Sequence, residues 1–254
     1  MNIVVPVKLV PDLVEELTVD QNGTALDTTW LRLIISEFDD HAIEQAILLK
    51  ERGAGPVVVI APDLEGADDV LYTAAARGAD RLIKLVGELR SGANNHALAR
   101  ALTPLAKALQ PDLVLTGVQA HNDLDGALGP LLAGYLGMPY VGYVAGIVLT
   151  DGNVVVRKEY PGGLIAEMQV ALPAVFGVQV ADQPPRYVAI SRVRQAMQTA
   201  SIEKQAVSEL DTGGGPIVTR MFQPEVTNRA SMVEGDVQAV ATSLVEILRQ
   251  LGAV

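Results

Sequence analysis

The chain has 254 residues, of which 49% are hydrophobic but only 4% aromatic, so any core it builds must be aliphatic. Its formal net charge of −11 argues against binding to nucleic acid or to anionic membranes, which requires a basic face. Because it contains no cysteine, disulfides and thiolate metal sites are excluded. No apolar run is long enough to cross a bilayer and the start lacks a secretory signal pattern, so we expect a cytoplasmic protein without direct membrane insertion.

The first 142 residues alternate short β-branched runs with helical patterns. Strands are predicted at residues 3–10, 56–61, 81–86, 112–117 and 140–144. Helices are predicted at residues 39–51, 67–77, 95–110 and 125–136, with Asn95 as the N-cap of the third. This alternation is typical of an α/β fold with an open, mostly parallel sheet and helices on both faces.

After residue 142 the rhythm changes to extended segments at 147–150, 154–160, 164–172 and 174–180. The separators Asp-Gly and Pro-Gly-Gly are turn sequences, so we expect antiparallel hairpins added to the sheet. Residues 1–182 are therefore predicted to form one α/β domain.

Residues 183–230 are polar and have few apolar clusters, which indicates an arm without a core of its own. The arm is predicted to end in a helix capped by Asp236, with a single apolar stripe formed by Val240, Leu244, Ile247 and Leu251. We expect residues 183–254 to pack on a partner subunit; the alternative is a tether back to the main domain.

Several kinds of catalytic site are missing from the sequence. The three histidines stand in unrelated segments without metal-ligand spacing. There is no G-x-S-x-G elbow, no G-x-x-x-x-G-K-[ST] phosphate loop, and no G-x-G-x-x-G turn after the first strand. We therefore expect no metal, and no general acid, base or nucleophile, in this chain.

One loop has the character of a ligand site. Residues 117–129 read GVQAHNDLDGALG and connect a predicted strand to a helix at the carboxyl edge of the sheet. Free N–H groups at the start of the helix favour a phosphate, and Gly126 and Gly129 allow a ligand to approach the backbone. Asp123 or Asp125 could instead cap the helix, so from the residues alone a nucleotide site and a capped, empty loop stay equally open.

The same loop resembles the G-x-Q-A-x-D-x-D-x-x-Q-x-G segment of the electron transfer flavoprotein beta family. Six further segments are similar in order and spacing: VPVKLVPD at 5–12, SEFDDHAIEQA at 36–46, AARGADR at 75–81, EYPGGL at 159–164, LPAV at 172–175 and PRY at 185–187. The resemblance extends from the first strand to about residue 198, and the terminal helix also fits.

The resemblance implies an adenine-nucleotide α-hydrolase-like fold and a partner, the electron transfer flavoprotein alpha subunit, which binds most of the FAD. The beta subunit would hold AMP as a structural nucleotide. The heterodimer would accept electrons from dehydrogenases, such as acyl-CoA dehydrogenases, and pass them to a quinone reductase. In electron-bifurcating members a second FAD occupies the AMP cleft.

The resemblance also implies the site residues. The cofactor-binding set is Pro6, Ser36, Glu37, Phe38, Asp39, Pro62, Gly117, Gln119, Ala120, His121, Asn122, Asp123, Asp125, Gly126, Ala127 and Leu128. The family's dehydrogenase-recognition segment corresponds to Tyr187 and the apolar anchor Ile190, whose alternative role is to pack within its own chain. This sequence departs from the family at Glu37, at Asn122, where the family has Asp, and at Ala127, where it has Gln.

Three functions remain open on the sequence alone, and only the third belongs to a different class. The first is an electron-carrying subunit with AMP, and the second is a bifurcating subunit with a second FAD. The third is a stand-alone nucleotide-binding module that forms a homodimer, against which the arm and the terminal helix argue.

Overall fold

The computed structural model describes residues 1–87, 93–124, 126–150, 153–207, 211–224, 230 and 232–253. Its chain separates into two compact units, Met1–Met221 and Phe222–Val254. The first unit holds the sheet and most of the helices, and the second holds a single helix among its described residues.

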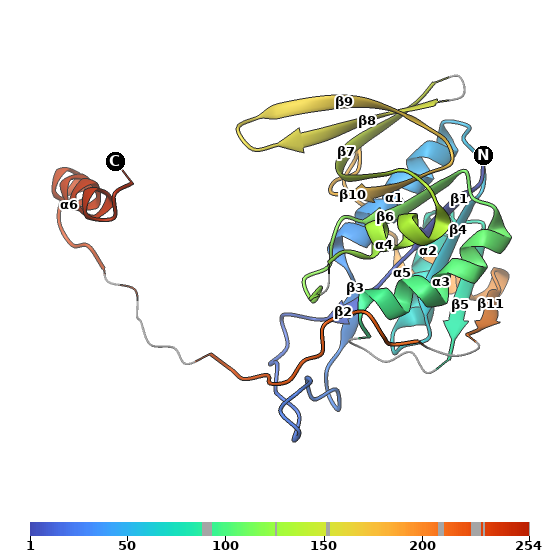
Figure 1. Ribbon diagram of the computed structural model, residues 1–254, viewed down its shortest axis with the longest axis horizontal. Helices are drawn as coiled ribbons and strands as arrows, with labels where there is room; N and C mark the ends of the chain where they lie inside the picture. Colours follow the sequence, from blue (N-terminus) through green and yellow to red (C-terminus); the bar gives the residue numbers. More distant parts are fainter. Residues whose placement is uncertain are drawn as a thin grey trace. The chain divides into compact units, whose positions relative to one another are not determined.

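Within the described residues, nine strands form one sheet in the order β11-β5-β4-β1-β6-β10-β7-β8-β9 (Figure 1). Their bounds are Ile3–Pro6 for β1, Val57–Pro62 for β4, Arg81–Val86 for β5, Leu113–Gly117 for β6, Tyr140–Thr150 for β7, Asn153–Tyr160 for β8, Leu164–Ala171 for β9, Ala174–Val178 for β10 and Ile202–Ala206 for β11. The pairs from β11 to β7 are parallel, whereas β7, β8 and β9 pair antiparallel. The predicted mostly parallel sheet with added hairpins is confirmed.

Helices cover both faces of this sheet. The helices are α1 at Glu37–Glu51, α2 at Ala67–Arg77, α3 at Asn95–Leu109, α4 at Leu128–Leu136 and α5 at Ile190–Thr199. Alternate residues of β1 point to opposite faces, so Ile3 and Val5 pack with α1 and α2, while Val4 packs with α3 and α4. Both faces of the central strands are therefore buried, which explains their continuous apolar sequences.

The first predicted strand is divided in the structure. Residues 3–10 form β1 and then β2 at Leu9–Pro11, which leaves the main sheet and pairs antiparallel with β3 at Leu33–Ile35. Apart from Lys8 the run is apolar, so periodicity gave no sign of the break. The peptide N–H of Lys8 is held instead by the side chain of Asp39, and this contact turns the chain away from the sheet.

Two elements lie where the sequence suggested only a polar arm. Residues 190–206 form α5, which packs on α2, and β11, which extends the sheet beside β5. β11 is an edge strand with mostly exposed side chains, which is why its composition resembled that of an arm. Arg81 and Glu203 join the two strands by paired hydrogen bonds of 3.0 and 2.9 Å.

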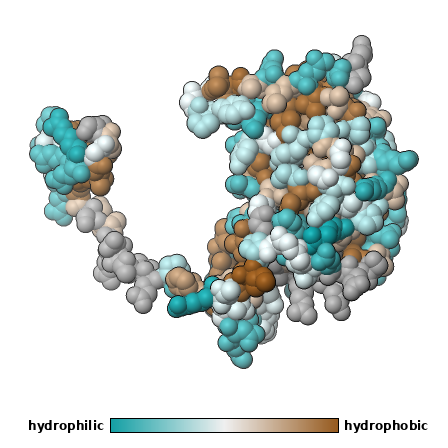
Figure 2. Space-filling model, viewed as in Figure 1, coloured by the Kyte–Doolittle hydropathy of each residue, from teal (hydrophilic) through white to brown (hydrophobic). Residues whose placement is uncertain are grey.

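The second unit contains α6, Val237–Gln250. The side chain of Asp236 accepts a hydrogen bond from the N–H of Ala239 at 2.9 Å, so the predicted N-cap is confirmed. Apolar residues gather on one side of this helix (Figure 2), and none of its residues is buried. Among the residues that the structure describes, no helix is long and apolar enough to span a bilayer.

Candidate functional site

The direction of strand addition reverses at β1. From β1 the chain proceeds to β4 and β5 on one side, and then to β6 on the other side. The loops after β1 and β6 therefore leave the sheet in different directions, and such a switch point is the place where open α/β sheets bind ligands. The predicted site residues Pro6, Pro62 and Gly117 are the last residues of β1, β4 and β6, and all three are buried.

Asp39 ties α1 to the end of β6 and to the residues between β1 and β2. Its carboxylate accepts hydrogen bonds from the N–H of Lys8 at 2.8 Å and from the N–H of Gly117 at 2.7 Å. Asp39 lies in the first turn of α1 and is only 4% exposed. Burial raises the pKa of this carboxyl from 3.8 to about 6, although the two backbone N–H donors oppose that shift.

The loop after β6 is tied to β1 and α3 by a group of polar side chains. The ammonium of Lys8 lies 2.5 Å from Oδ1 of Asp123, 2.9 Å from Oδ1 of Asn95 and 3.4 Å from Oδ1 of Asn122. The amide of Asn95 donates to Asp123 at 2.8 Å and to the carbonyl of Gly126 at 2.5 Å. Oδ2 of Asp123 accepts from the N–H of Ala120 at 2.8 Å. We call Lys8, Asn95 and Asp123 the loop lock.

The loop lock changes the role that the sequence allowed for Asp123. Its carboxylate is occupied by Lys8, Asn95 and the N–H of Ala120. Ala127, the N-cap of α4, makes no side-chain capping hydrogen bond. Asp125 lies outside the described residues. Among the described residues, no side chain therefore caps the first turn of α4, and an anion is the natural partner of its N–H groups.

A cavity of about 520 Å³ opens beside this helix start. Loop residues Gln119, Asp123, Gly126 and Ala127 line one side of it. The other side is formed by β7, β8 and β9 and includes the side chains Tyr140, Tyr143, Lys158 and Met168. Burial raises the pKa of Tyr140 to about 12, so its hydroxyl stays protonated near neutral pH. The walls thus combine aromatic rings with hydrogen-bonding groups, a composition typical of small-molecule sites.

The remaining predicted residues occupy different positions around this edge. Glu37, Gln119, His121 and Gly126 are exposed, Phe38, Asn122 and Ala127 are half-buried, and Ser36, Ala120 and Leu128 are buried. Gly126 has φ +83° and open space around it, as a backbone approached by a ligand requires. Gly129 differs, because a Cβ there would lie 2.6 Å from Oγ1 of Thr116, so this glycine serves helix packing.

Two residues of the loop lock were not among the predicted site residues. Lys8 was assigned only to a strand motif, since nothing in the local sequence indicated its partners more than 80 residues away. Asn95 was predicted to be an N-cap, and this is wrong: Asn94 is the cap and accepts from the N–H of Ala97 at 2.8 Å. Asn95 lies inside the helix and is 1% exposed, and its amide binds the loop.

The segment predicted to recognise dehydrogenases lies at the start of α5. Tyr187 is 88% exposed and Ile190 is 66% exposed. Arg186, which precedes Tyr187 in the chain, is held on α1 by hydrogen bonds to Glu44 at 2.8 Å and to Glu51 at 2.6 Å. These bonds raise the pKa of Arg186, so it stays charged and keeps the segment against α1.

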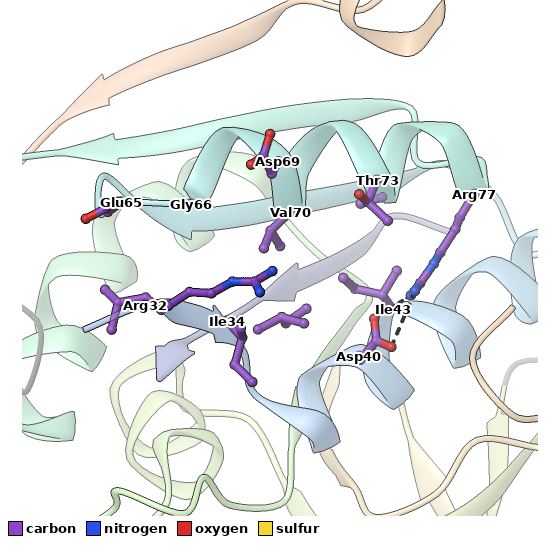
Figure 3. A pocket seen from close by; sticks show the side chains of 13 residues that line it. Arg32, Ile34, Asp40, Ile43, Glu65, Gly66, Asp69, Val70, Thr73 and Arg77 are labelled. Carbon is purple, nitrogen blue, oxygen red and sulfur yellow. Dashed lines mark hydrogen bonds and ion pairs between the residues drawn. The ribbon is translucent and has the colours of Figure 1, made fainter. Parts of the chain in front are cut away.

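A second cavity, of about 390 Å³, lies between β3, α1 and α2 (Figure 3). Arg77 crosses its end to pair with Asp40 at 2.5 Å, and Ile43 lies near this pair. Arg32 extends into the cavity below Val70 of α2. None of the predicted nucleotide-site residues lines this cavity. Over the described part of the chain, no group of three or more His, Asp or Glu side chains is placed to hold a metal.

Comparisons with known proteins agree with this architecture. Residues 26–210 match the family model described as "Electron transfer flavoprotein domain". The chain belongs to the electron transfer flavoprotein beta subunit family. It is 29% identical to the electron transfer flavoprotein subunit beta of Methylophilus methylotrophus, over 98% of both chains. It is 31% identical to the mitochondrial subunit beta of Oryza sativa subsp. japonica, again over 98% of both chains.

Family membership sets the class of the protein. Members of this beta subunit family are components of electron carriers rather than conventional enzymes, and their name associates them with a flavin. The subunit beta of Syntrophomonas wolfei is also similar, with 30% identity over 86% of this chain and 85% of the relative.

Proposed function

We propose that this chain is the beta subunit of a heterodimeric electron transfer flavoprotein that holds AMP at the carboxyl edge of its sheet. The alpha subunit binds FAD, and this chain helps to enclose it. The redox chemistry is supplied by the flavin, and the residues of this chain provide binding and shape. Electrons arrive from a dehydrogenase, of which the acyl-CoA dehydrogenases are one example, and leave towards a quinone reductase.

The observation that carries the nucleotide assignment is the start of α4 at the switch point, which no side chain of the described residues caps. Its N–H groups and helix dipole suit a phosphate, and Gly126 leaves the backbone open beside it. The adenosine part would extend along the edge formed by the ends of β1 and β4 and by residues 36–39, the stretches that the family resemblance also indicates.

Acid extraction of the complex, purified with its flavin-bearing partner, tests this assignment. One AMP and one FAD per heterodimer is the expected content. A complex that releases FAD but no AMP would contradict the nucleotide assignment while leaving the subunit assignment intact.

A second function rests on Ala127 and the adjacent cavity. The family has Gln at this position, and the smaller side chain here lines a space of about 520 Å³. The smaller side chain favours a second FAD, as in the bifurcating members. Two flavins per heterodimer, and no AMP, would establish this alternative, whereas a one-to-one flavin ratio excludes it.

A further inference from the structure

The loop lock uses every hydrogen-bonding group of the Lys8 ammonium. Its three N–H donors point to three oxygens, one each on Asn95, Asn122 and Asp123. The side chains of Lys8 and Asp123 are only 11% and 9% exposed, so the pair is largely removed from water. A lysine near a predicted phosphate site would ordinarily be taken for a phosphate ligand, but here no donor is left for that role.

The partners of Lys8 organise the backbone of the loop. Asp123 holds the N–H of Ala120, and the N–H of Asp123 donates in turn to the carbonyl of Ala120 at 3.0 Å. Asn95 holds the carbonyl of Gly126, next to the N-cap of α4. The same side chains therefore fix the start of the loop and the point at which it enters the helix.

The charges of the lock are balanced as they stand. One ammonium faces one carboxylate, with neutral amides at the two other positions. With the family's Asp at position 122, two carboxylates would share this cation. Asn122 thus keeps a second loop carboxylate away from this cation in this chain.

We propose that Lys8 is a positioning residue, which pre-forms the nucleotide loop through Asp123 and Asn95 and does not bind the phosphate. This inference rests on the proposed nucleotide site for its functional meaning. The phosphate is then held by backbone N–H groups, and Lys8 affects AMP binding through the shape of the loop.

Hydrogen exchange tests the lock without any ligand. In the full-length chain with its partner, Lys8→Met should speed exchange of the Ala120 and Asp123 amides at least about tenfold, because their opening no longer breaks a charged contact. Asp123→Asn keeps an oxygen that can accept from the Ala120 N–H, but it loses the charge that pairs with Lys8, so it should speed exchange as Lys8→Met does. Lys8→Arg keeps the positive charge and should largely preserve the protection of both amides. Lys50→Met is the matched control, since it removes a lysine paired with Asp80 at the far end of α1. Unchanged exchange of both amides in Lys8→Met would overturn the proposal.

Measurements of ligand binding distinguish a Lys8 that positions the loop from a Lys8 that contacts the phosphate itself. Dissociation constants for AMP and for adenosine are measured by calorimetry on nucleotide-free complex. Lys8→Met should weaken AMP binding at least about tenfold, because the loop that holds the phosphate is no longer fixed. Asp123→Asn leaves the Lys8 ammonium in place but removes its charged partner, so it should weaken AMP binding by a similar factor. Adenosine lacks the phosphate and should lose less affinity in both variants. Unchanged or tighter AMP binding by Asp123→Asn, together with a loss in Lys8→Met, would make Lys8 a phosphate ligand and refute the positioning role. If the unmutated complex binds neither compound, the proposed nucleotide site fails, while the exchange experiment still decides whether the lock holds the loop.

Discussion

Gly117 lies so close to Asp39, in the first turn of α1, that a side chain at position 117 would not fit. A Cβ on Gly117 would lie 2.7 Å from Oδ1 of Asp39 and 2.8 Å from its backbone nitrogen. The sequence indicated this glycine as part of a ligand loop. The structure gives it an additional role, because it lets α1 approach the end of β6 closely enough for Asp39 to accept its N–H.

Gly117→Ala is therefore expected to destabilise the protein. The added methyl group must displace a buried carboxylate and a helix backbone, at a cost of about 1–3 kcal/mol in the free energy of unfolding. Urea denaturation of the full-length chain measures this change. Gly134→Ala is the control, because Gly134 lies inside α4 with nothing within 4 Å of the new Cβ. It should stabilise the helix by about 0.5–1 kcal/mol, and equal effects at both positions would contradict the packing argument.

The buried carboxyl of Asp39 predicts a dependence of stability on pH. Its pKa is about 6 in the folded protein, against an ordinary value of 3.8, so between these values the folded state binds more protons than the unfolded state. The contribution of Asp39 to stability is therefore present below pH 4 and is lost as the pH rises to about 6. A difference of about two pKa units corresponds to about 3 kcal/mol.

The difference between the wild-type chain and Asp39→Asn isolates this contribution. Denaturation midpoints at several pH values from 4 to 7 should show a negative slope that the variant lacks. The neighbouring Glu37→Gln, at an exposed position, serves as the control and should retain the slope. Parallel curves for wild type and Asp39→Asn would show that Asp39 does not titrate in this range.

Ile190→Ala should slow electron delivery from the cognate dehydrogenase. The side chain is 66% exposed on a segment that Arg186 fixes to α1, so an apolar pocket of a partner can receive it. Loss of such an anchor weakens docking roughly five- to thirtyfold. Flavin content should stay unchanged, and stopped-flow reduction of the complex gives the rate. Met197→Ala, a 42% exposed position on the same helix, is the matched control. A transfer rate unaffected by Ile190→Ala would remove the anchor role.

The apolar stripe of α6 is expected to bind the alpha subunit. Leu244 is 48% exposed and Ile247 is 43% exposed in a helix that buries none of its residues. Leu244→Asp should weaken the heterodimer at least about tenfold, because a charge would be placed in an apolar contact. Thr242→Asp, on the opposite side of the helix, should have little effect. Sedimentation or calorimetry measures the affinity, and equal behaviour of the two variants would argue against a binding role for the stripe.

Secondary structure was predictable wherever periodicity and turn residues agreed. The pattern of α2 gave both of its ends, and Asp236 correctly marked the start of α6. Prediction was poorer where long-range contacts override local preference. β2 separates from β1 because Asp39 holds the N–H of Lys8, and β11 forms because β5 offers it an edge. Neither contact is visible in the few residues that form the strand.

The sequence by itself determined the class of fold, the family, and the loop at which a ligand would bind, since these depend on local periodicity and on motifs in order. Only the tertiary structure decided how that loop is held. Lys8, Asn95 and Asp123 are separated by up to 115 positions, and chain folding brings them within 2.5–2.9 Å. Buried polar groups must find partners on folding, and the choice of partner is a property of the packed core rather than of the local sequence.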